Sequence, residues 1–454
     1  MCDQLRSFEV GCYGNEIVKT PHLDSLAANG VRFDIAVSNN PVCTPARSCL
    51  LTGQYSRTCA GYLGNEGDEA PPYHRKKLLD ITMPELFKQA GYRTALIGKW
   101  HLAAHPKLVG FDEYLFPKLH HLNYNQIYFD ESGRGFTVNG LAEDFNCARL
   151  ESFLEKQAQS DSPFFVFYNI ATPHMPFFDV PQEFLAMYSK DDVRLRDNVF
   201  VDNKMAYDEN WFKIYLWDYL YYQGFFQNDR FGSPFELPPN FDLRDLTALY
   251  YGMVSFTDEY VGRMMNLLRK HSLIEDTIVV FTSDHGDNLG SHHRFNKGLL
   301  IEESIRIPLI IHDTRNSKPS ENTTQVASLI DVMPTVLSLC DIEIPPAVQG
   351  NNLAPIVKGE RNVLDINCAF IETTAGEIGI RTPTHLYGMK LADDFRVVSD
   401  DKLYFYDIAN DPYEQNNLAK TGEQSDMLIN PDLSGAQVLR EKLMAWNEKT
   451  RWLR

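Results

Sequence analysis

The sequence lacks the features that would place the protein in a membrane or on a nucleic acid. No apolar run approaches the roughly 20 residues that span a bilayer, and charges lie where the apolar core of a secretory signal would be. There is no run of Lys or Arg, and 43 basic residues against 61 acidic ones give a net charge of −18. Such a surface repels phosphate backbones and anionic lipids, so we expect neither nucleic acid nor membrane as a partner.

Cysteine is too sparse for a scaffold held by disulfides. Eight cysteines are scattered over 454 residues, and none has the C-x-x-C spacing of a structural zinc site. We expect most of them to be reduced and buried, which, with no secretory segment visible, favours a cytoplasmic location. The eight are Cys2, Cys12, Cys43, Cys49, Cys59, Cys147, Cys340 and Cys368.

The apolar content is sufficient for a large core, since 44% of the residues are hydrophobic and 12% are aromatic. Short apolar runs alternate with amphipathic segments, which predicts an α/β fold with a large central mixed sheet between layers of helices. Several predicted strands end in polar residues, where open α/β sheets bind their ligands. The predicted strands are 94–98, 164–170, 277–282 and 306–312, and the predicted helices are 22–29, 83–90, 142–157 and 245–271.

Composition changes twice along the chain and suggests its domain organisation. A main domain over residues 1–355 contains an irregular insertion, at about 188–244, that is rich in aromatic and acidic residues and is expected to line or cover the site. Residues 356–454 form a predicted smaller α+β subdomain with an antiparallel sheet. Its predicted strands lie near 368–372, 378–390 and 402–407, and its helix lies near 435–446.

The beginning of the chain is unusual if Asp3 is a site residue at the end of a strand. Only Met1 and Cys2 precede it, although a strand should lead into such a position. Two explanations fit: the sequence starts downstream of its natural start, or the first strand is short.

The segment around Cys43 is the most informative in the chain. It reads CTPARSCLLTGQY, and Pro45 favours the first turn of a helix, so Cys43 is expected at the helix N-terminus. Backbone N–H groups and the helix dipole stabilise an anion at that place, and Arg47 follows one turn later. The residues alone leave open a plain thiolate nucleophile or a small buried cysteine.

This segment resembles the C-x-P-x-R signature of the sulfatase family, whose cysteine is oxidised after translation to formylglycine. Further blocks resemble the family in the same order and together cover nearly the whole chain. They are GYRTALIGKWHL (91–102), TPHMPF (172–177), FTSDHGDNLGSHHRFNKG (281–298), EESIRIPLII (302–311) and LYFYDIANDPYEQNNLA (403–419). The resemblance implies an alkaline-phosphatase-like fold and the hydrolysis of a sulfate monoester to an alcohol and inorganic sulfate.

The resemblance also implies the site's cofactors. Asp3, Asp284 and His285 would hold one divalent metal ion, together with Cys43 after its conversion by a formylglycine-generating maturation enzyme. Hard oxygen ligands favour Ca²⁺ or Mg²⁺, with Ca²⁺ the first expectation, and a histidine ligand shifts the preference toward Mn²⁺. One hydroxyl of the hydrated aldehyde would attack sulfur, and the other would then expel sulfate.

The remaining roles follow from position in the family's motifs. Arg47 and Lys99 would hold the diol and sulfate oxygens, and His101 would take a proton from the diol. His174 and Lys297 would face the bridging oxygen and protonate the departing alcohol.

The start of the chain departs from the family pattern, which often has two adjacent aspartates there. In this sequence Gln4 follows Asp3. Gln4 is therefore a doubtful ligand. The Asp3–Gln4 and Asp284–His285 pairs look more like the choline-sulfatase and phosphonate-monoesterase branches than the lysosomal arylsulfatases.

Each of these residues has an ordinary structural explanation when taken singly. His174 alone would read as a loop histidine, and Lys99 and Lys297 as solvated surface charges. The co-occurrence of the blocks in order is what favours a site. Other residues are predicted to lie outside it: His120 and His121 at the surface, Asp287 and Glu302 as orienting residues, and His292 and His293 as substrate contacts at most.

Two other functions stay open at this level. One is a phosphonate or phosphate-ester hydrolase on the same scaffold, because the two tetrahedral groups have similar shapes. The other is a non-catalytic anion-binding protein whose Cys43 is never converted. For the substrate, a carbohydrate or small-molecule O-sulfate ranks above simple aryl sulfates, and the aromatic insertion could also enclose a quaternary ammonium group. The oligomeric state is not predicted.

Overall fold

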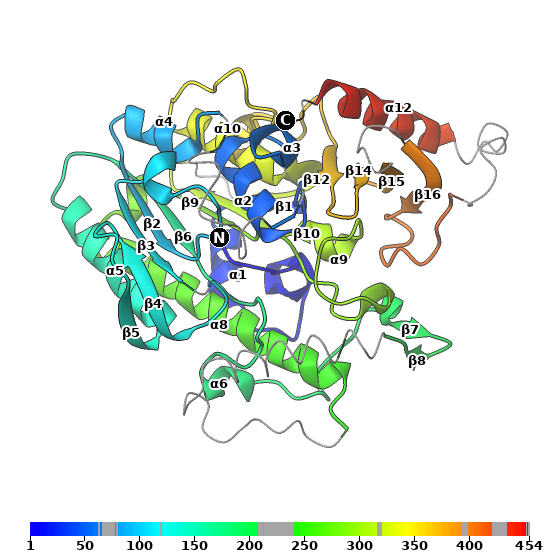
Figure 1. Cartoon of the computed structure of the whole chain (residues 1–454), viewed down its shortest axis with the longest axis horizontal. Helices are drawn as coiled ribbons and strands as arrows, with labels where there is room; N and C mark the ends of the chain where they lie inside the picture. The colour runs from blue at the N-terminus through cyan, green and yellow to red at the C-terminus, as the bar shows by residue number, and fades with distance from the viewer. Residues whose placement is uncertain are drawn as a thin grey trace.

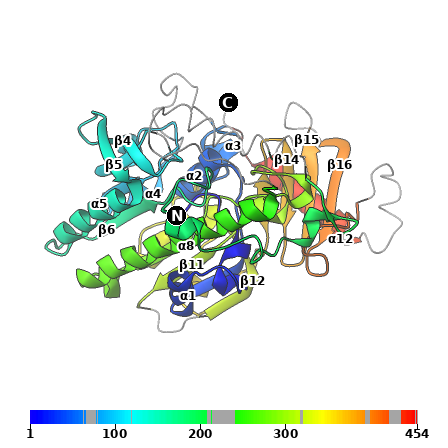
Figure 2. The same cartoon turned by 90° about the horizontal axis from the view of Figure 1, so that it is seen from below.

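Two five-stranded sheets form the centre of the protein, and helices cover both of their faces (Figures 1 and 2). The computed structural model describes residues 1–61, 64–65, 78, 80–118, 120–207, 212, 240–315, 320–391, 398–419, 434–450 and 452. Within these residues, no helix combines the length and the apolar character that crossing a bilayer requires. All eight cysteines are free, and five of them are buried.

The first sheet has the order β5-β4-β3-β2-β6, with β2 parallel to both of its neighbours. The second has the order β10-β1-β11-β9, and β12 pairs with β1. The predicted strand 306–312 is two strands, because Pro308 lies between them and has no N–H for a ladder. The strands are β1 (Val31–Val37), β2 (Arg93–Gly98), β3 (Glu113–Pro117), β4 (Tyr124–Asp130), β5 (Phe136–Leu141), β6 (Phe164–Asn169), β9 (Ile278–Thr282), β10 (Arg306–Ile307), β11 (Leu309–Asp313) and β12 (Ser320–Ser328).

The first three residues join the two sheets. The Ile170 N–H donates to the Met1 carbonyl on one side, and the Cys2 N–H donates to the Thr282 carbonyl at 3.0 Å on the other. Cys2 and Asp3 also form parallel bridges with Ser283 and Pro173. The strand position expected before Asp3 therefore exists between β6 and β9, and residues 1–3 fill only its end. The rest of the gap is a mostly apolar cavity of about 530 Å³.

Successive side chains of a strand point to opposite faces of its sheet, and this alternation divides the core into two layers. Ala95 and Ile97 point to one face of the first sheet, where helices α1, α5 and α8 pack, and Leu96 points to the other, where α2, α4 and α10 pack. The predicted helices are present, with shifts of at most two residues at their ends. The longer helices are α1 (Pro21–Ala28), α2 (Cys43–Thr52), α4 (Met83–Gln89), α5 (Ala142–Gln157), α8 (Leu243–Lys270) and α10 (Leu329–Leu339).

The C-terminal part forms a separate antiparallel sheet with a helix packed on it, as predicted (Figure 1). The predicted strand 378–390 is a hairpin of two strands rather than one. The elements are β13 (Ala369–Glu372), β14 (Glu377–Arg381), β15 (His385–Leu391), β16 (Val398–Asp407) and α12 (Ser434–Lys449).

Short elements complete the described fold. The predicted insertion at 188–244 falls largely outside the described residues, and its described beginning contains a small hairpin. The short elements are η1 (Ser7–Glu9), η2 (Gly11–Tyr13), α3 (Ser56–Cys59), η3 (Pro106–Val109), α6 (Gln182–Leu185), η4 (Asp197–Val199), β7 (Phe200–Val201), β8 (Lys204–Met205), η5 (Ile274–Asp276), η6 (Ser291–His293), α9 (Glu302–Ile305) and α11 (Ala354–Val357).

Candidate active site

The candidate site lies where several strands end and one helix begins. Asp284 and His285 come just after β9, separated from it by Ser283. Lys99 directly follows β2, and Asp3 ends the short bridge between the sheets. Cys43 is the first residue of α2, so it occupies the N-terminus of that helix as the sequence predicts. The fold thereby brings the family's separate sequence blocks to one edge of the sheets.

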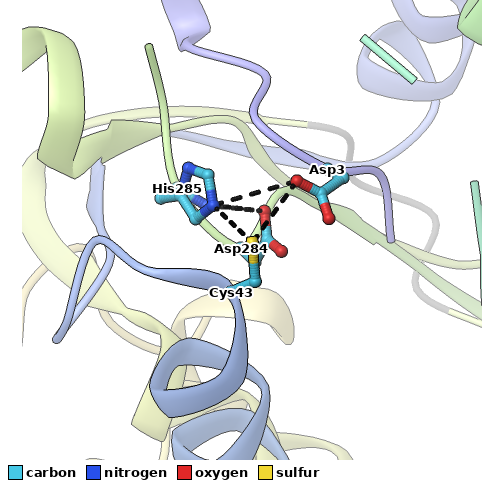
Figure 3. Close-up of side chains that lie close together, drawn as sticks. All are labelled: Asp3, Cys43, Asp284 and His285. Atoms are coloured by element: carbon cyan, nitrogen blue, oxygen red, sulfur yellow. Dashed lines mark hydrogen bonds and ion pairs between the residues drawn. The ribbon is translucent and has the colours of Figure 1, made fainter. Parts of the chain in front are cut away.

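The four residues predicted to bind metal converge on one point (Figure 3). Their ligand atoms all lie within 4.8 Å of one another, and all four residues are buried. The Cys43 sulfur is 3.2 Å from His285 Nε2 and 3.8 Å from Asp3 Oδ1. His285 Nε2 is 3.6 Å from Asp284 Oδ1.

This donor set is suited to a divalent cation. His285 Nδ1 lies 2.8 Å from the Gly286 carbonyl, which can only accept, so the ring proton is on Nδ1 and the Nε2 lone pair faces the cluster. Burial and the neighbouring Asp3 raise the pKa of Asp284, because two carboxylates in a dry interior repel each other. A bound cation would remove that repulsion.

Arg47 lies behind the two carboxylates. Its guanidinium donates to Asp3 Oδ2 at 3.0 Å and to Asp284 Oδ2 at 3.0 and 3.2 Å. Its remaining N–H groups donate to the Lys99 carbonyl and, at 3.4 Å, to Asn169 Oδ1. The structure adds a role that the sequence did not indicate, since Arg47 holds both carboxylates in place. Its contacts with the diol and sulfate oxygens stay a prediction.

Two lysines approach the Cys43 sulfur. Lys297 Nζ lies 3.0 Å from it and Lys99 Nζ lies 3.9 Å from it, and Lys99 also forms an ion pair with Asp3. Burial works against the thiolate, yet Lys297, Lys99 and a neighbouring histidine outweigh it and hold the pKa of the Cys43 thiol well below its usual value. The pocket is therefore strongly electropositive around the sulfur, although the whole chain is acidic.

His174 contacts the same lysine from the far side. Its Nδ1 lies 2.6 Å from the Met175 carbonyl and must carry the ring proton, so Nε2 accepts a hydrogen bond from Lys297 Nζ at 2.9 Å. Burial and Lys297 lower the pKa of His174 to about 4, which keeps the ring neutral. His101 is also buried, and the Thr44 hydroxyl donates to its carbonyl.

The Gln4 side chain contacts Lys297 and Asp287. Its oxygen accepts a hydrogen bond from Lys297 Nζ at 2.9 Å, and the amide nitrogen donates to Asp287. Asp287 thus orients a neighbour, as predicted. Glu302 does the same, since it pairs with Arg381 at 2.8 Å.

The histidines predicted to lie at the surface are half-buried and also contact site residues. His121 stacks on His174, with ring centroids 3.8 Å apart, and its Nδ1 lies 3.0 Å from Lys99 Nζ. His120 stacks on His101, with ring centroids 4.9 Å apart. The sequence gave no signal for this, because both residues lie in an irregular connection between β3 and β4. Asn169 was also missed, although its place at the end of a predicted strand could have indicated it.

The other unassigned histidines lie outside this cluster. His292 Nε2 is 3.2 Å from Asn198 Nδ2 and sits beside Glu303 and Glu414. Arg196 neutralises Glu303, and burial together with Glu303 raises the pKa of Glu414 well above its usual value. These contacts are separate from the cluster around Cys43.

Comparisons with known proteins agree with this geometry. A family model described as Sulfatase matches residues 1–342, and one described as the C-terminal region of N-sulphoglucosamine sulphohydrolase matches residues 290–434. An ulvan-active sulfatase of Formosa agariphila is 32% identical over 441 residues, which cover 92% of this chain and 76% of that protein. The chain belongs to the sulfatase family.

Other relatives support the same activity. An N-acetylglucosamine-6-O-sulfatase of Bacteroides thetaiotaomicron is 27% identical to the present chain. The alignment covers 92% of the present chain and 81% of the Bacteroides protein. A solved structure in complex with its substrate, D-glucosamine-2-N,6-O-disulfate, covers 99% of this chain and 97% of its own, with a TM-score of 0.76 and 25% identity. A phosphonate monoester hydrolase of Agrobacterium radiobacter shares the fold, with a TM-score of 0.70 and 21% identity. The protein is a sulfuric ester hydrolase of the alkaline-phosphatase-like fold, a family that generally uses a divalent metal and formylglycine.

Proposed function

We propose that this sulfatase hydrolyses a carbohydrate O-sulfate with a formylglycine made from Cys43. The observation that carries the proposal is the position of the Cys43 sulfur, at the point where three metal-binding side chains and two lysines meet. A hydrated aldehyde at this position would have one hydroxyl for attack on sulfur and a second for release of the product. The family resemblance implies a maturation enzyme for the oxidation. Because Cys43 is buried in the folded chain, that enzyme would have to act before folding is complete.

The side chains around Cys43 suit the two halves of the reaction. One hydroxyl of the hydrated aldehyde bonds to sulfur as the bond to the bridging oxygen breaks. The alcohol takes a proton from the Lys297–His174 pair, and that pair recovers a proton from the attacking hydroxyl. Lys99 faces the sulfuryl oxygens. His101 then takes the proton of the second hydroxyl as the carbon–oxygen bond to sulfate breaks, which restores the aldehyde, and one water rehydrates it.

A divalent ion, Ca²⁺ by preference, is proposed for the cluster of Asp3, Asp284 and His285. Carboxylate ligands favour Ca²⁺ or Mg²⁺, and the histidine would also accept Mn²⁺. Such an ion supplies Lewis-acid stabilisation to a sulfate oxygen and to the nucleophile. Arg47 pairs with both carboxylates and orients them.

The substrate class is proposed from the relatives. The ulvan-active sulfatase, the N-acetylglucosamine-6-O-sulfatase and the complex with a disulfated glucosamine all act on or bind sulfated carbohydrates by their names. We therefore expect sulfate release from N-acetylglucosamine-6-sulfate to exceed that from 4-nitrophenyl sulfate at equal concentration. The reverse order would contradict the carbohydrate proposal but not the sulfatase assignment.

The conversion of Cys43 is tested by the mass of its peptide after co-expression with a maturation enzyme. Replacing the thiol by an aldehyde lowers the mass by about 18 Da. Cys43→Ala should abolish turnover with little effect on the fold, since it removes the nucleophile but only a small side chain. An unconverted peptide in a fully active preparation, or turnover near wild type in Cys43→Ala, would refute the proposed nucleophile.

The metal is tested by thermal unfolding, which requires no turnover. Ca²⁺ at about 100 times its Kd should stabilise the metal-free protein by about 2.7 kcal/mol and raise its Tm. Asp284→Asn should lose most of that shift, because it replaces a buried carboxylate ligand with a neutral amide. Glu302→Gln is the matched control, a buried carboxylate paired with Arg381 away from the cluster. The proposal is wrong if Ca²⁺, Mg²⁺ and Mn²⁺ all leave the Tm unchanged.

A further inference from the structure

His121 connects the two functional halves of the pocket. On one side its ring stacks nearly parallel on His174, with centroids 3.8 Å apart and an interplanar angle of 9°. On the other its Nδ1 lies 3.0 Å from Lys99 Nζ. His174 and its partner Lys297 are proposed to face the leaving oxygen, and Lys99 is proposed to face the sulfuryl oxygens.

The contact with Lys99 fixes how His121 is protonated. An ammonium group can only donate, so His121 Nδ1 accepts and the ring proton of the neutral imidazole is on Nε2. Burial, His174 and Lys99 lower the pKa of His121 well below its usual value, in agreement with that geometry. A neutral ring can lie against these groups without adding a repulsive charge.

This contact also restricts the orientation of Lys99. Its ammonium group has three N–H bonds. One is used by the ion pair with Asp3, a second by His121, and the third is left in the direction of the Cys43 sulfur, 3.9 Å away. Without His121, the second N–H has no fixed acceptor and the group can rotate about its stem.

We propose that His121 is a positioning residue of the active site, which orients Lys99 through Nδ1 and holds the plane of His174 through its ring. The proposal rests on the roles given above to Lys99 and His174. It assigns His121 no proton transfer. Because the residue acts through its two neighbours, separate variants can remove one contact and keep the other.

Two substitutions make that separation. His121→Phe keeps the stacked ring and removes the acceptor, whereas His121→Asn keeps an acceptor near Nδ1 and removes the ring. We expect His121→Phe to lower kcat about 10- to 100-fold for both 4-nitrophenyl sulfate and a sugar sulfate, with KM raised by less than about tenfold, because small displacements of a catalytic group act mainly on the chemical step. His121→Asn should stay within about fivefold of wild type on 4-nitrophenyl sulfate and lose more on the sugar sulfate, whose alcohol needs a proton.

A binding measurement makes the test independent of turnover. Inorganic sulfate presents the oxygens that Lys99 faces, so calorimetry should show weaker sulfate binding, by about five- to tenfold, for His121→Phe than for the wild type. His312→Phe is the matched control, a half-buried histidine whose Nδ1 bonds to the Asn29 carbonyl, and it should bind sulfate like the wild type.

The outcomes separate this proposal from the proposed function. Unchanged sulfate affinity in His121→Phe overturns the positioning role, whether or not turnover is detected. Equal losses by His121→Phe and His121→Asn on both substrates, with a parallel fall in Tm, also overturn it, because they indicate a role in folding alone. A wild-type protein that binds sulfate tightly and in a His121-dependent way but cleaves no sulfate ester supports the positioning role and refutes the proposed reaction.

Discussion

Lys297 is the side chain best placed to protonate the departing alcohol. His174 carries its proton on Nδ1, bonded to the Met175 carbonyl, and offers Nε2 as an acceptor to Lys297. The neutral histidine therefore cannot donate to the substrate from Nε2. The ammonium group of Lys297 can donate. Burial lowers the pKa of Lys297, but the nearby Cys43 and Asp3 outweigh burial and leave that pKa raised, which favours the protonated form.

This assignment predicts a dependence on the leaving group. Lys297→Ala should slow the hydrolysis of a sugar or alkyl sulfate about 10²- to 10⁴-fold, the usual contribution of a general acid. It should slow 4-nitrophenyl sulfate far less, because 4-nitrophenolate leaves without a proton. Steady-state kinetics on both substrates measure the difference. Lys99→Ala serves as the comparison, since a group facing the sulfuryl oxygens should affect both substrates equally, and the same equal loss in Lys297→Ala would contradict its role as the acid.

Single residues were predictable only where a motif fixes their chemistry. Cys43, Asp284 and His285 come together as the sequence indicated, because they belong to blocks whose order and residue types point to one site. The orientation of Arg47 toward the carboxylates was not predictable, since it depends on where strands from distant segments end. His121 gave no signal at all, because an irregular connection has no period from which its path could be inferred.

At the scale of elements, a mostly apolar cavity lies between β6 and β9. Residues 1–3 run parallel to both strands but occupy only the end of the gap. The remaining cavity is lined by β6 and β9 and by apolar side chains from helices on both faces of the sheets. The Met1 ammonium group is buried there, donates to the Tyr168 carbonyl at 2.8 Å, and has its pKa lowered by burial to about 6.

This geometry predicts the effect of a designed extension. Five apolar β-branched residues joined ahead of Met1 should continue the strand between β6 and β9, pair with their free edges and raise the Tm by several degrees. A Gly-Ser extension of equal length is the control, because it can pair but buries no side chains. Differential scanning calorimetry compares them, and equal Tm values for the two extensions would show that the gap does not accept a strand.

The apolar extension should also remove a pH dependence of the protein's stability. The amino group of the unextended chain has a folded pKa of about 6 against 8.0 for a free one, so the unfolded chain binds more protons between these values. Stability should therefore rise as pH increases from about 6 to 8. In the extended protein the amino group lies outside the gap, and that rise should be absent.

Element types and approximate bounds were predictable because buried strands and amphipathic helices leave different periods in the sequence. The predicted helix at 142–157 matches α5 without a shift. The pairing partners were not predictable, since β1 contacts strands formed by residues 306–328, far along the chain. The division of 306–312 at Pro308 could have been predicted, because proline lacks the N–H that a continuous strand needs.

In the whole molecule, the C-terminal sheet is held against the catalytic part by buried side chains. The fold class and the antiparallel character of that sheet were predictable from composition and spacing. The contact between the two parts was not, because it depends on single residues more than 300 positions apart, as in the pairing of Arg57 with Glu372.

Arg57 on α3 is the centre of that contact. It forms a buried ion pair with Glu372 of β13, donates to Asn447 of α12 at 2.7 Å, and lies over the Trp446 ring at 4.5 Å. Glu372 in turn accepts from the Arg57 N–H at 3.1 Å and the Ser56 hydroxyl at 3.2 Å. One fully buried ion pair thus connects α3 of the catalytic part with both the sheet and the helix of the C-terminal part.

Removing one member of this pair should destabilise the whole protein. Arg57→Ala should lower the free energy of unfolding by about 3–5 kcal/mol, because it leaves the Glu372 carboxylate buried without its partner. The double variant Arg57→Met with Glu372→Leu should lose less free energy of unfolding than Arg57→Ala, since no unpaired charge remains. Arg361→Ala is the control, because its pair with Asp365 is solvent-exposed and should contribute less than about 1 kcal/mol. Urea unfolding measures all three, and a loss in Arg57→Ala no larger than that in Arg361→Ala would show that this pair does not hold the two parts together.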